Sequence, residues 1–126
     1  MSGGWIGVDL DGTLAHYEDW QGELHIGEPI PAMVERIKNW LRCGIEVRIF
    51  TARVCMPDGV ILLGKDGTRM SVDEIRSAIQ DYTELLFGVR LKVTNEKDFG
   101  MIELWDDRAI RVRANTGEPC CDDHSR

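Results

Sequence analysis

The feature that most constrains the fold is a short apolar run near the start of the chain that ends in two acidic residues. Residues 5–8 read Trp-Ile-Gly-Val, and Asp9 and Asp11 follow, with a turn signal at Asp11-Gly12. An apolar run closed by a turn predicts a buried β-strand. Ligands of open α/β sheets bind beyond the carboxyl ends of the strands, which is where both aspartates are expected. Two neighbouring carboxylates repel each other, so the pair favours a Mg²⁺ site or a shared proton over a simple surface turn.

The composition is that of an acidic globular domain. The chain has 126 residues, with 15 basic and 22 acidic side chains, a formal net charge of −7 and 43% hydrophobic residues. This length supports one domain, and the acidic balance opposes a large nucleic-acid or anionic-membrane surface. No apolar run approaches the roughly 20 residues of a membrane span, and the N-terminus does not resemble a signal peptide. The four cysteines lack a disulfide-framework spacing, so we expect a cytoplasmic protein. A homo-oligomer is left open.

The rest of the chain alternates between helical and strand patterns. Residues 15–30 have no helical period and predict a loop or flap. Pro31 suits the first turn of a helix whose apolar period runs to residue 43, and Gly44 is a good terminator. Residues 45–50 then predict a strand.

The second half begins irregularly, with a loop or hairpin expected over residues 53–70 that includes a strand at 60–63 and a turn at 65–67. Ser71 and Glu74 form a capping-box pattern, which predicts a helix from Val72 to Gly88. Further strands are expected at 89–93, 101–105 and 110–112. We therefore predict an α/β, Rossmann-like domain over residues 1–113, with a mainly parallel sheet flanked by helices, followed by a frayed tail at 114–126.

The run Asp9-x-Asp11-Gly12-Thr13-Leu14 resembles the first signature of the haloacid-dehalogenase-like (HAD) superfamily. Most members of that superfamily are Mg²⁺-dependent phosphohydrolases that act through an aspartyl-phosphate. Thr51, which closes an apolar strand, resembles the second signature, and Asp106-Asp107 after the strand at 101–105 resembles the fourth. Together with a lysine, the signatures occur in order over residues 6–107. The resemblance implies a HAD-type version of the predicted fold.

The signature lysine has two candidates, Lys97 and Lys92. A phosphate pocket lined by carboxylates needs a fixed positive charge. Lys97 is preferred because it follows a strand end, and because short members of the superfamily carry the lysine about that far before the final acidic pair. Lys92 lies inside a predicted strand, where a solvent-exposed position is expected.

The resemblance implies a role for each signature residue. Asp9 would be the nucleophile, Asp11 the general acid and base, and Thr51 a ligand of the phosphate oxygens, while Lys97 would offset their charge. Mg²⁺ would be held by Asp9, by Asp11 through its backbone carbonyl, and by one of two further acids. Which of these two, Asp106 or Asp107, binds the metal directly is left open.

Several other residues are candidates for a functional site. Thr13 and Arg53 are candidate substrate contacts, although an exposed surface arginine is an equal alternative. Trp20 could cover the site or a partner surface. Cys120, Cys121 and His124 offer ligand atoms but lack zinc-site spacing, which favours a simple tail.

The segments at 15–30 and 53–70 are too short to form a separate cap domain, so the chain resembles a small, nearly capless HAD member. We predict a Mg²⁺-dependent phosphomonoester hydrolase whose open site admits a nucleotide or another phosphate ester. The alternative is a non-catalytic phospho-accepting or phosphate-binding switch that resembles a receiver domain.

Overall fold

A four-stranded parallel sheet forms the centre of the computed structural model, which describes residues 3–57, 59–63, 67 and 69–120. The strands are β1 (Trp5–Asp9), β2 (Glu46–Phe50), β5 (Lys92–Thr94) and β6 (Met101–Trp105), in the order β5-β2-β1-β6. All three neighbouring pairs are parallel, and Gly7 of β1 lies opposite Arg48 of β2 and Leu104 of β6. The expected α/β class with a mainly parallel sheet is confirmed.

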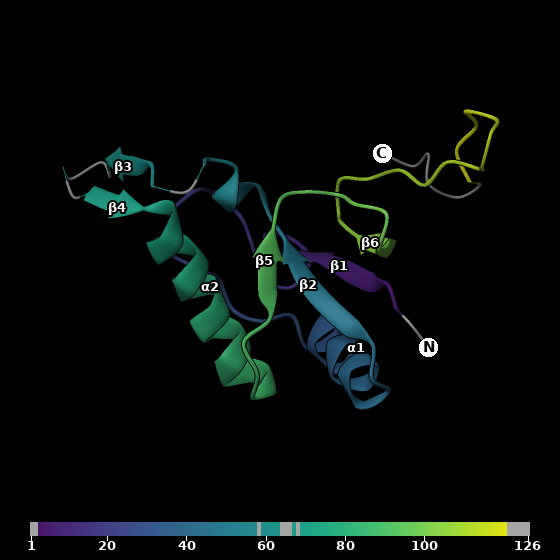
Figure 1. Cartoon of the computed structure of the whole chain (residues 1–126), viewed down its shortest axis with the longest axis horizontal. Coiled ribbons are helices and arrows are strands. Elements are labelled where there is room, and N and C mark those ends of the chain that lie inside the picture. Colours follow the sequence, from purple (N-terminus) through teal and green to yellow (C-terminus); the bar gives the residue numbers. More distant parts are fainter. Residues whose placement is uncertain (1–2, 58, 64–66, 68, 121–126) are drawn as a thin grey trace.

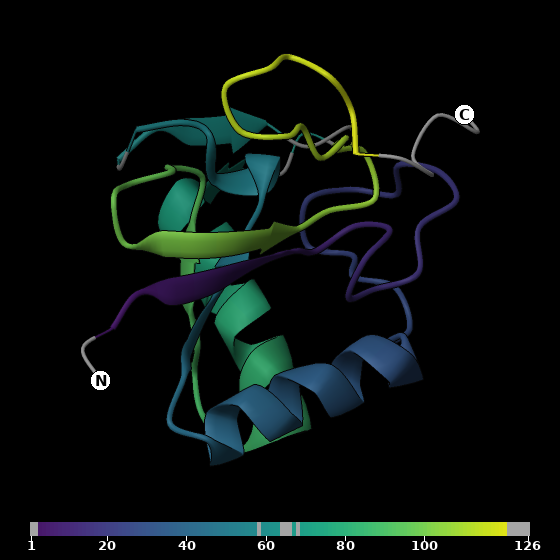
Figure 2. The same cartoon turned by 90° about the vertical axis from the view of Figure 1, so that its right-hand side faces the viewer.

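Helices α1 (Pro31–Arg42) and α2 (Val72–Phe87) lie on the same side of this sheet (Figures 1 and 2). Alternate strand residues point toward them, as the two-residue period of a strand requires. The buried core joins aliphatic side chains of the strands and both helices, namely Ile6, Val8, Val47, Ile49, Val93, Ile37, Ile75 and Ile79. Each fully buried side chain of this kind stabilises the fold by about 1.5–3 kcal/mol.

Local signals set the ends of both helices. Pro31 occupies the start of α1, and α1 ends just before Gly44, which adopts a φ of +80°. The Ser71 hydroxyl accepts a hydrogen bond from the backbone N–H of Glu74, and the Glu74 side chain accepts one from the Ser71 N–H. The predicted capping box is therefore confirmed, and α2 ends at Phe87 with the expected Gly88 as its C-cap.

The segment 95–100, which links β5 to β6, crosses the opposite side of the sheet. It contacts Trp5, whose indole N–H donates to the Asp98 carboxylate over 2.8 Å. The guanidinium of Arg48 lies 4.5 Å from the centre of the Trp5 ring. On the helical side, Trp105 packs against Trp40 of α1, with ring centres 5.3 Å apart.

A small antiparallel hairpin stands apart from the main sheet at the start of α2 (Figure 1). It consists of β3 (Ile61–Leu63) and β4 (Arg69–Ser71), and a short 3₁₀ helix, η1 (Ala52–Val54), precedes it. The expected hairpin within 53–70 is thus confirmed, while residues 65 and 66 of its expected turn lie outside the described residues. No helix in the described part of the chain is long and apolar enough to cross a membrane.

Two expected strands in the second half are wrong in their bounds or existence. The strand predicted at 89–93 is β5, Lys92–Thr94, because Arg90 instead turns back to pair with Asp81 and Glu84 of α2. Residues 110–112 form no strand. Only an isolated bridge joins Val112 to Pro119 there.

Residues 114–120 of the expected tail form a local turn. This turn is closed by a hydrogen bond from the Arg113 N–H to the Glu118 carbonyl and by another from Cys120 to Arg111. The backbone at Val112 therefore joins a local bridge rather than an additional strand of the sheet.

Candidate functional site

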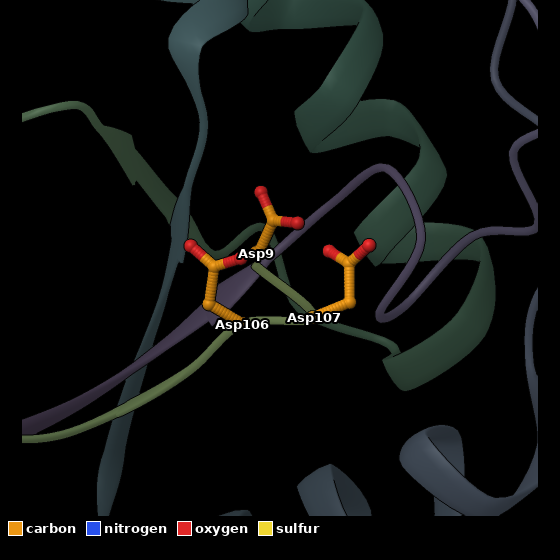
Figure 3. A group of neighbouring side chains, drawn as sticks. All are labelled: Asp9, Asp106 and Asp107. Carbon is orange, nitrogen blue, oxygen red and sulfur yellow. The ribbon is translucent and has the colours of Figure 1, made fainter. Parts of the chain in front are cut away.

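Three carboxylates converge at the carboxyl edge of the parallel sheet. Asp9 is the last residue of β1, and Asp106 and Asp107 directly follow the neighbouring strand β6. Because the two strands are parallel, their carboxyl ends meet at one edge. One oxygen from each of the three residues lies within 4.8 Å of the others, and the carboxylates face a common space (Figure 3).

The cluster is electrostatically strained when no cation is present. Burial, followed by the charge of Asp106 and by the hydrogen bond and charge of Asp107, raises the pKa of Asp9 from 3.8 to about 7. The charge of Asp11 adds to this effect. A bound cation would relieve this repulsion, and an all-oxygen set of ligands suits a hard cation such as Mg²⁺. The residues present therefore fit a divalent metal.

The loop after β1 holds these acids in place. Gly12 has a φ of +91°, and a Cβ atom there would lie only 2.5 Å from Oδ2 of Asp107. The hydroxyl of Thr13 accepts a hydrogen bond from the Asp107 N–H over 3.1 Å. The same oxygen lies 3.3 Å from Oδ1 of Asp107 and 3.4 Å from Oδ2 of Asp9, so its single proton can serve either carboxylate. Thr13, expected as a substrate contact, thus lies between the acids.

Asp11 forms an ion pair with an arginine from the next strand end. Nε of Arg53 donates to Oδ2 of Asp11 over 2.9 Å, and a terminal nitrogen donates to Oδ1 over 2.7 Å. The Arg53 side chain is only 5% exposed, which contradicts the alternative of a free surface arginine. Each carboxylate oxygen of Asp11 therefore accepts one hydrogen bond from Arg53 and keeps a second lone pair for another donor.

Thr51 lies at the carboxyl end of β2 and is buried, with 2% of its surface exposed. Its hydroxyl oxygen accepts a hydrogen bond from the Arg53 N–H and so caps η1. Its own proton is not used by this bond. Thr51 also lines the cleft beside the acids, so the cap leaves a donor available there.

The lysine expected in the site lies outside the cleft lining. Lys97 is exposed in the segment that leaves the carboxyl end of β5, and Lys92 is exposed within β5. Arg53 and Arg108 are the cationic side chains that line the cleft.

The cleft itself has a volume of about 400 Å³ and opens over the acidic cluster. Beyond the expected residues, its wall includes side chains that sequence reasoning left out: Tyr17, Phe50, Ala52 and Arg108. Phe50, Ala52 and Arg108 are sequence neighbours of Thr51 or Asp107. This adjacency could have identified them as candidates for the cleft wall. Trp20, expected to cover the site or a partner surface, also lines the cleft.

Comparisons with known proteins leave the family of this chain open. No family model matches it, and no curated protein matches it. Among solved structures it is similar to one described as the structure of a conserved protein coded by a locus from Bacteroides thetaiotaomicron. The two sequences are 19% identical, the match covers 86% of this chain and 78% of that chain, and the TM-score is 0.49.

Proposed function

We propose that this chain is a Mg²⁺-dependent phosphomonoester hydrolase that forms an aspartyl-phosphate on Asp9. The observation that carries the proposal is the convergence of Asp9, Asp106 and Asp107 within 4.8 Å at the carboxyl edge of a parallel sheet. The resemblance of the same residues to the HAD signatures supports it. The metal would be held by the carboxylates of Asp9, Asp106 and Asp107 and by the backbone carbonyl of Asp11. When bound, it would offset the negative charge of the phosphoryl oxygens.

The remaining side chains have roles that follow from their positions. A carboxylate oxygen of Asp9 attacks phosphorus, and the bond from phosphorus to the ester oxygen breaks. The Thr51 hydroxyl, with a free proton at the cleft wall, donates to a phosphoryl oxygen. Asp11, protonated once Arg53 turns from it to the substrate, gives that proton to the leaving ester oxygen. Its carboxylate then takes a proton from the water that attacks the aspartyl-phosphate, so inorganic phosphate leaves and Asp9 is regenerated.

The first test replaces the proposed nucleophile. Asp9→Asn should lower the Mg²⁺-dependent release of inorganic phosphate from a phosphomonoester by roughly a thousandfold or more, because an amide oxygen cannot form a stable acyl-phosphate. The measurement is phosphate release with and without Mg²⁺, over a panel of nucleotides, sugar phosphates and phosphopeptides. The matched control is Asp73→Asn, which removes an exposed carboxylate from the first turn of α2.

Retention of wild-type activity by Asp9→Asn would exclude the proposed nucleophile.

The same assay decides which of the two lysines offsets the phosphate charge. If Lys97 offsets phosphate charge after a movement of its segment, then Lys97→Met lowers activity and Lys92→Met leaves it unchanged. The reverse result would transfer the role to Lys92.

A second function, a phospho-accepting switch, is favoured by the ion pair between Asp11 and Arg53. A carboxylate that stays paired with arginine is a weaker base for the hydrolytic water, so the phosphorylated Asp9 would persist longer. The lifetime of the acyl-phosphate after reaction with a small phosphoryl donor separates the two functions. Turnover within seconds supports the hydrolase, and a species that lasts for hours supports the switch.

A further inference from the structure

The flap, residues 15–30, presents two aromatic side chains to the cleft. Tyr17 and Trp20 line it together with Asp9, and they are 38% and 41% exposed. The flap lies beyond the carboxyl ends of β1 and β6 (Figure 2). The site thus has an acidic floor that suits a metal and a phosphate, and an aromatic wall that suits a flat apolar group.

Trp20 is held in position by a chain of contacts that begins at Asp11. The guanidinium carbon of Arg53 lies 5.0 Å from the centre of the Trp20 ring, which is a cation–π contact. Arg53 is itself fixed by Asp11 and by the Glu23 carbonyl, which accepts a hydrogen bond over 2.9 Å. One face of the indole is therefore contacted by the buried guanidinium of Arg53, and Trp20 also lines the cleft. These contacts hold the Trp20 ring in place before a ligand binds, which reduces the entropy lost on binding.

Resting on the proposed function, we propose that the substrate is a nucleoside monophosphate whose base stacks on Trp20 while its phosphate reaches Asp9. Aromatic side chains stack with bases of every kind, because each base has a π-face. The cleft volume of about 400 Å³ is in the range of small-molecule pockets. The net charge of −7 repels long polyanions, so a mononucleotide is favoured over a nucleic-acid end.

The test compares a nucleotide with the same phosphate ester lacking its base. Adenosine 5′-monophosphate and ribose 5-phosphate are assayed with the wild type, Trp20→Leu and Trp20→Phe. The wild type should prefer the nucleotide in kcat/KM, and Trp20→Leu should lower this preference by roughly tenfold through KM, the size of a lost base stack. Trp20→Phe, which keeps an aromatic face, should restore part of it.

The matched control is Leu24→Ala, which removes an exposed apolar side chain of the flap outside the cleft lining. Leu24→Ala should leave kcat/KM for both substrates at the wild-type value. A wild type without preference for the nucleotide, or a Trp20→Leu variant that loses both activities equally, would overturn the proposal. Faster hydrolysis of a phosphorylated oligonucleotide end than of the mononucleotide would also overturn it.

A binding measurement separates failure of this inference from failure of the proposed function. Adenosine 5′-monophosphate is titrated into the Asp9→Asn variant, and tryptophan fluorescence is followed with Trp20 present and with Trp20→Phe. Quenching that requires Trp20 supports stacking of the base on this ring, even if no phosphate ester is hydrolysed. Equal quenching in both proteins would place the base elsewhere.

Discussion

At Gly12 the backbone passes close to the acidic cluster. Its φ of +91° is a conformation that favours glycine, and the nearest atoms to a built Cβ all belong to the Asp107 carboxylate. The position therefore has two separate requirements, a left-handed backbone and space for a ligand oxygen. Either one would disfavour a side chain, but only the second concerns the metal site.

Gly12→Ala should weaken Mg²⁺ binding because the new methyl group displaces the Asp107 carboxylate. The left-handed conformation also costs about 1–2 kcal/mol of stability for a residue with a Cβ. The matched control is Gly44→Ala, which has a similar φ of +80° but no atom within 4 Å of its built Cβ. Chemical unfolding with and without Mg²⁺ separates the effects. Both variants should lose stability, and only Gly12→Ala should lose the stabilisation by Mg²⁺; equal Mg²⁺ responses would contradict the role of Gly12.

The acids of the site could be predicted from sequence, whereas the Arg53 ion pair could not. Asp9, Asp106 and Asp107 each follow an apolar strand pattern, and parallel strands bring their carboxyl ends to one edge. The pairing of Arg53 with Asp11 joins residues 42 positions apart and depends on the course of η1 and the flap. No local sequence pattern predicts such a contact. The sequence was therefore equally compatible with a substrate contact and with an exposed surface position for Arg53.

Hydrogen bonds join the two arms of the flap to each other and to helix α2. The two arms are joined where the His16 N–H donates to the Glu28 carbonyl over 2.8 Å, and a Cβ on Gly27 would lie 2.0 Å from the His16 carbonyl oxygen. The hydroxyl of Tyr82 on α2 donates to the Gly27 carbonyl over 2.9 Å. Burial, followed by the charges of Glu28 and Asp11, raises the Tyr82 pKa to about 12, so this donor keeps its proton at neutral pH.

Tyr82→Phe should loosen the flap and lower stability by about 1 kcal/mol, because a partly buried carbonyl loses its partner. Hydrogen exchange of the flap amides should accelerate more than exchange in β1 or β2. Tyr17→Phe is the control, since its hydroxyl forms no hydrogen bond among the described residues. Unchanged flap exchange in Tyr82→Phe would show that the two joined arms are sufficient to hold the flap.

Elements with local end signals were the most predictable. The capping box of Ser71 and Glu74 and the terminal Gly88 define α2 to the residue. The strand predicted at 89–93 began too early because tertiary contacts override its apolar pattern. The backbone N–H of Leu91 donates to the Thr83 hydroxyl, and Arg90 pairs with the surface of α2, so the chain stays against the helix until Lys92.

At the scale of the whole molecule, a chain with a net charge of −7 carries a site whose carboxylates must be ionised to bind a metal. The pKa of Asp9 is raised to about 7, so the native state binds a proton more tightly than the unfolded chain. The stability from this group is fully present below pH 3.8 and is lost as the pH rises through 7. Asp98 has the opposite sign, since the Trp5 indole N–H and the Gly100 N–H lower its pKa. Its contribution to stability is therefore present above pH 3.8 and is lost at lower pH, outside the range in which Asp9 acts.

Without divalent metal, the wild type should therefore lose stability relative to Asp9→Asn between pH 5 and pH 8. A shift from 3.8 to about 7 corresponds to at most ~4 kcal/mol, and the partial exposure of Asp9 reduces the expected loss to about 1–2 kcal/mol. Mg²⁺ should reverse the loss in the wild type, with a small effect at pH 5 and a full effect at pH 8, because only the ionised carboxylate binds metal. The measurement is urea unfolding of both proteins at each pH, in EDTA and in Mg²⁺. Parallel pH profiles for wild type and Asp9→Asn would show that the three carboxylates do not share the strained site from which the proposed chemistry follows.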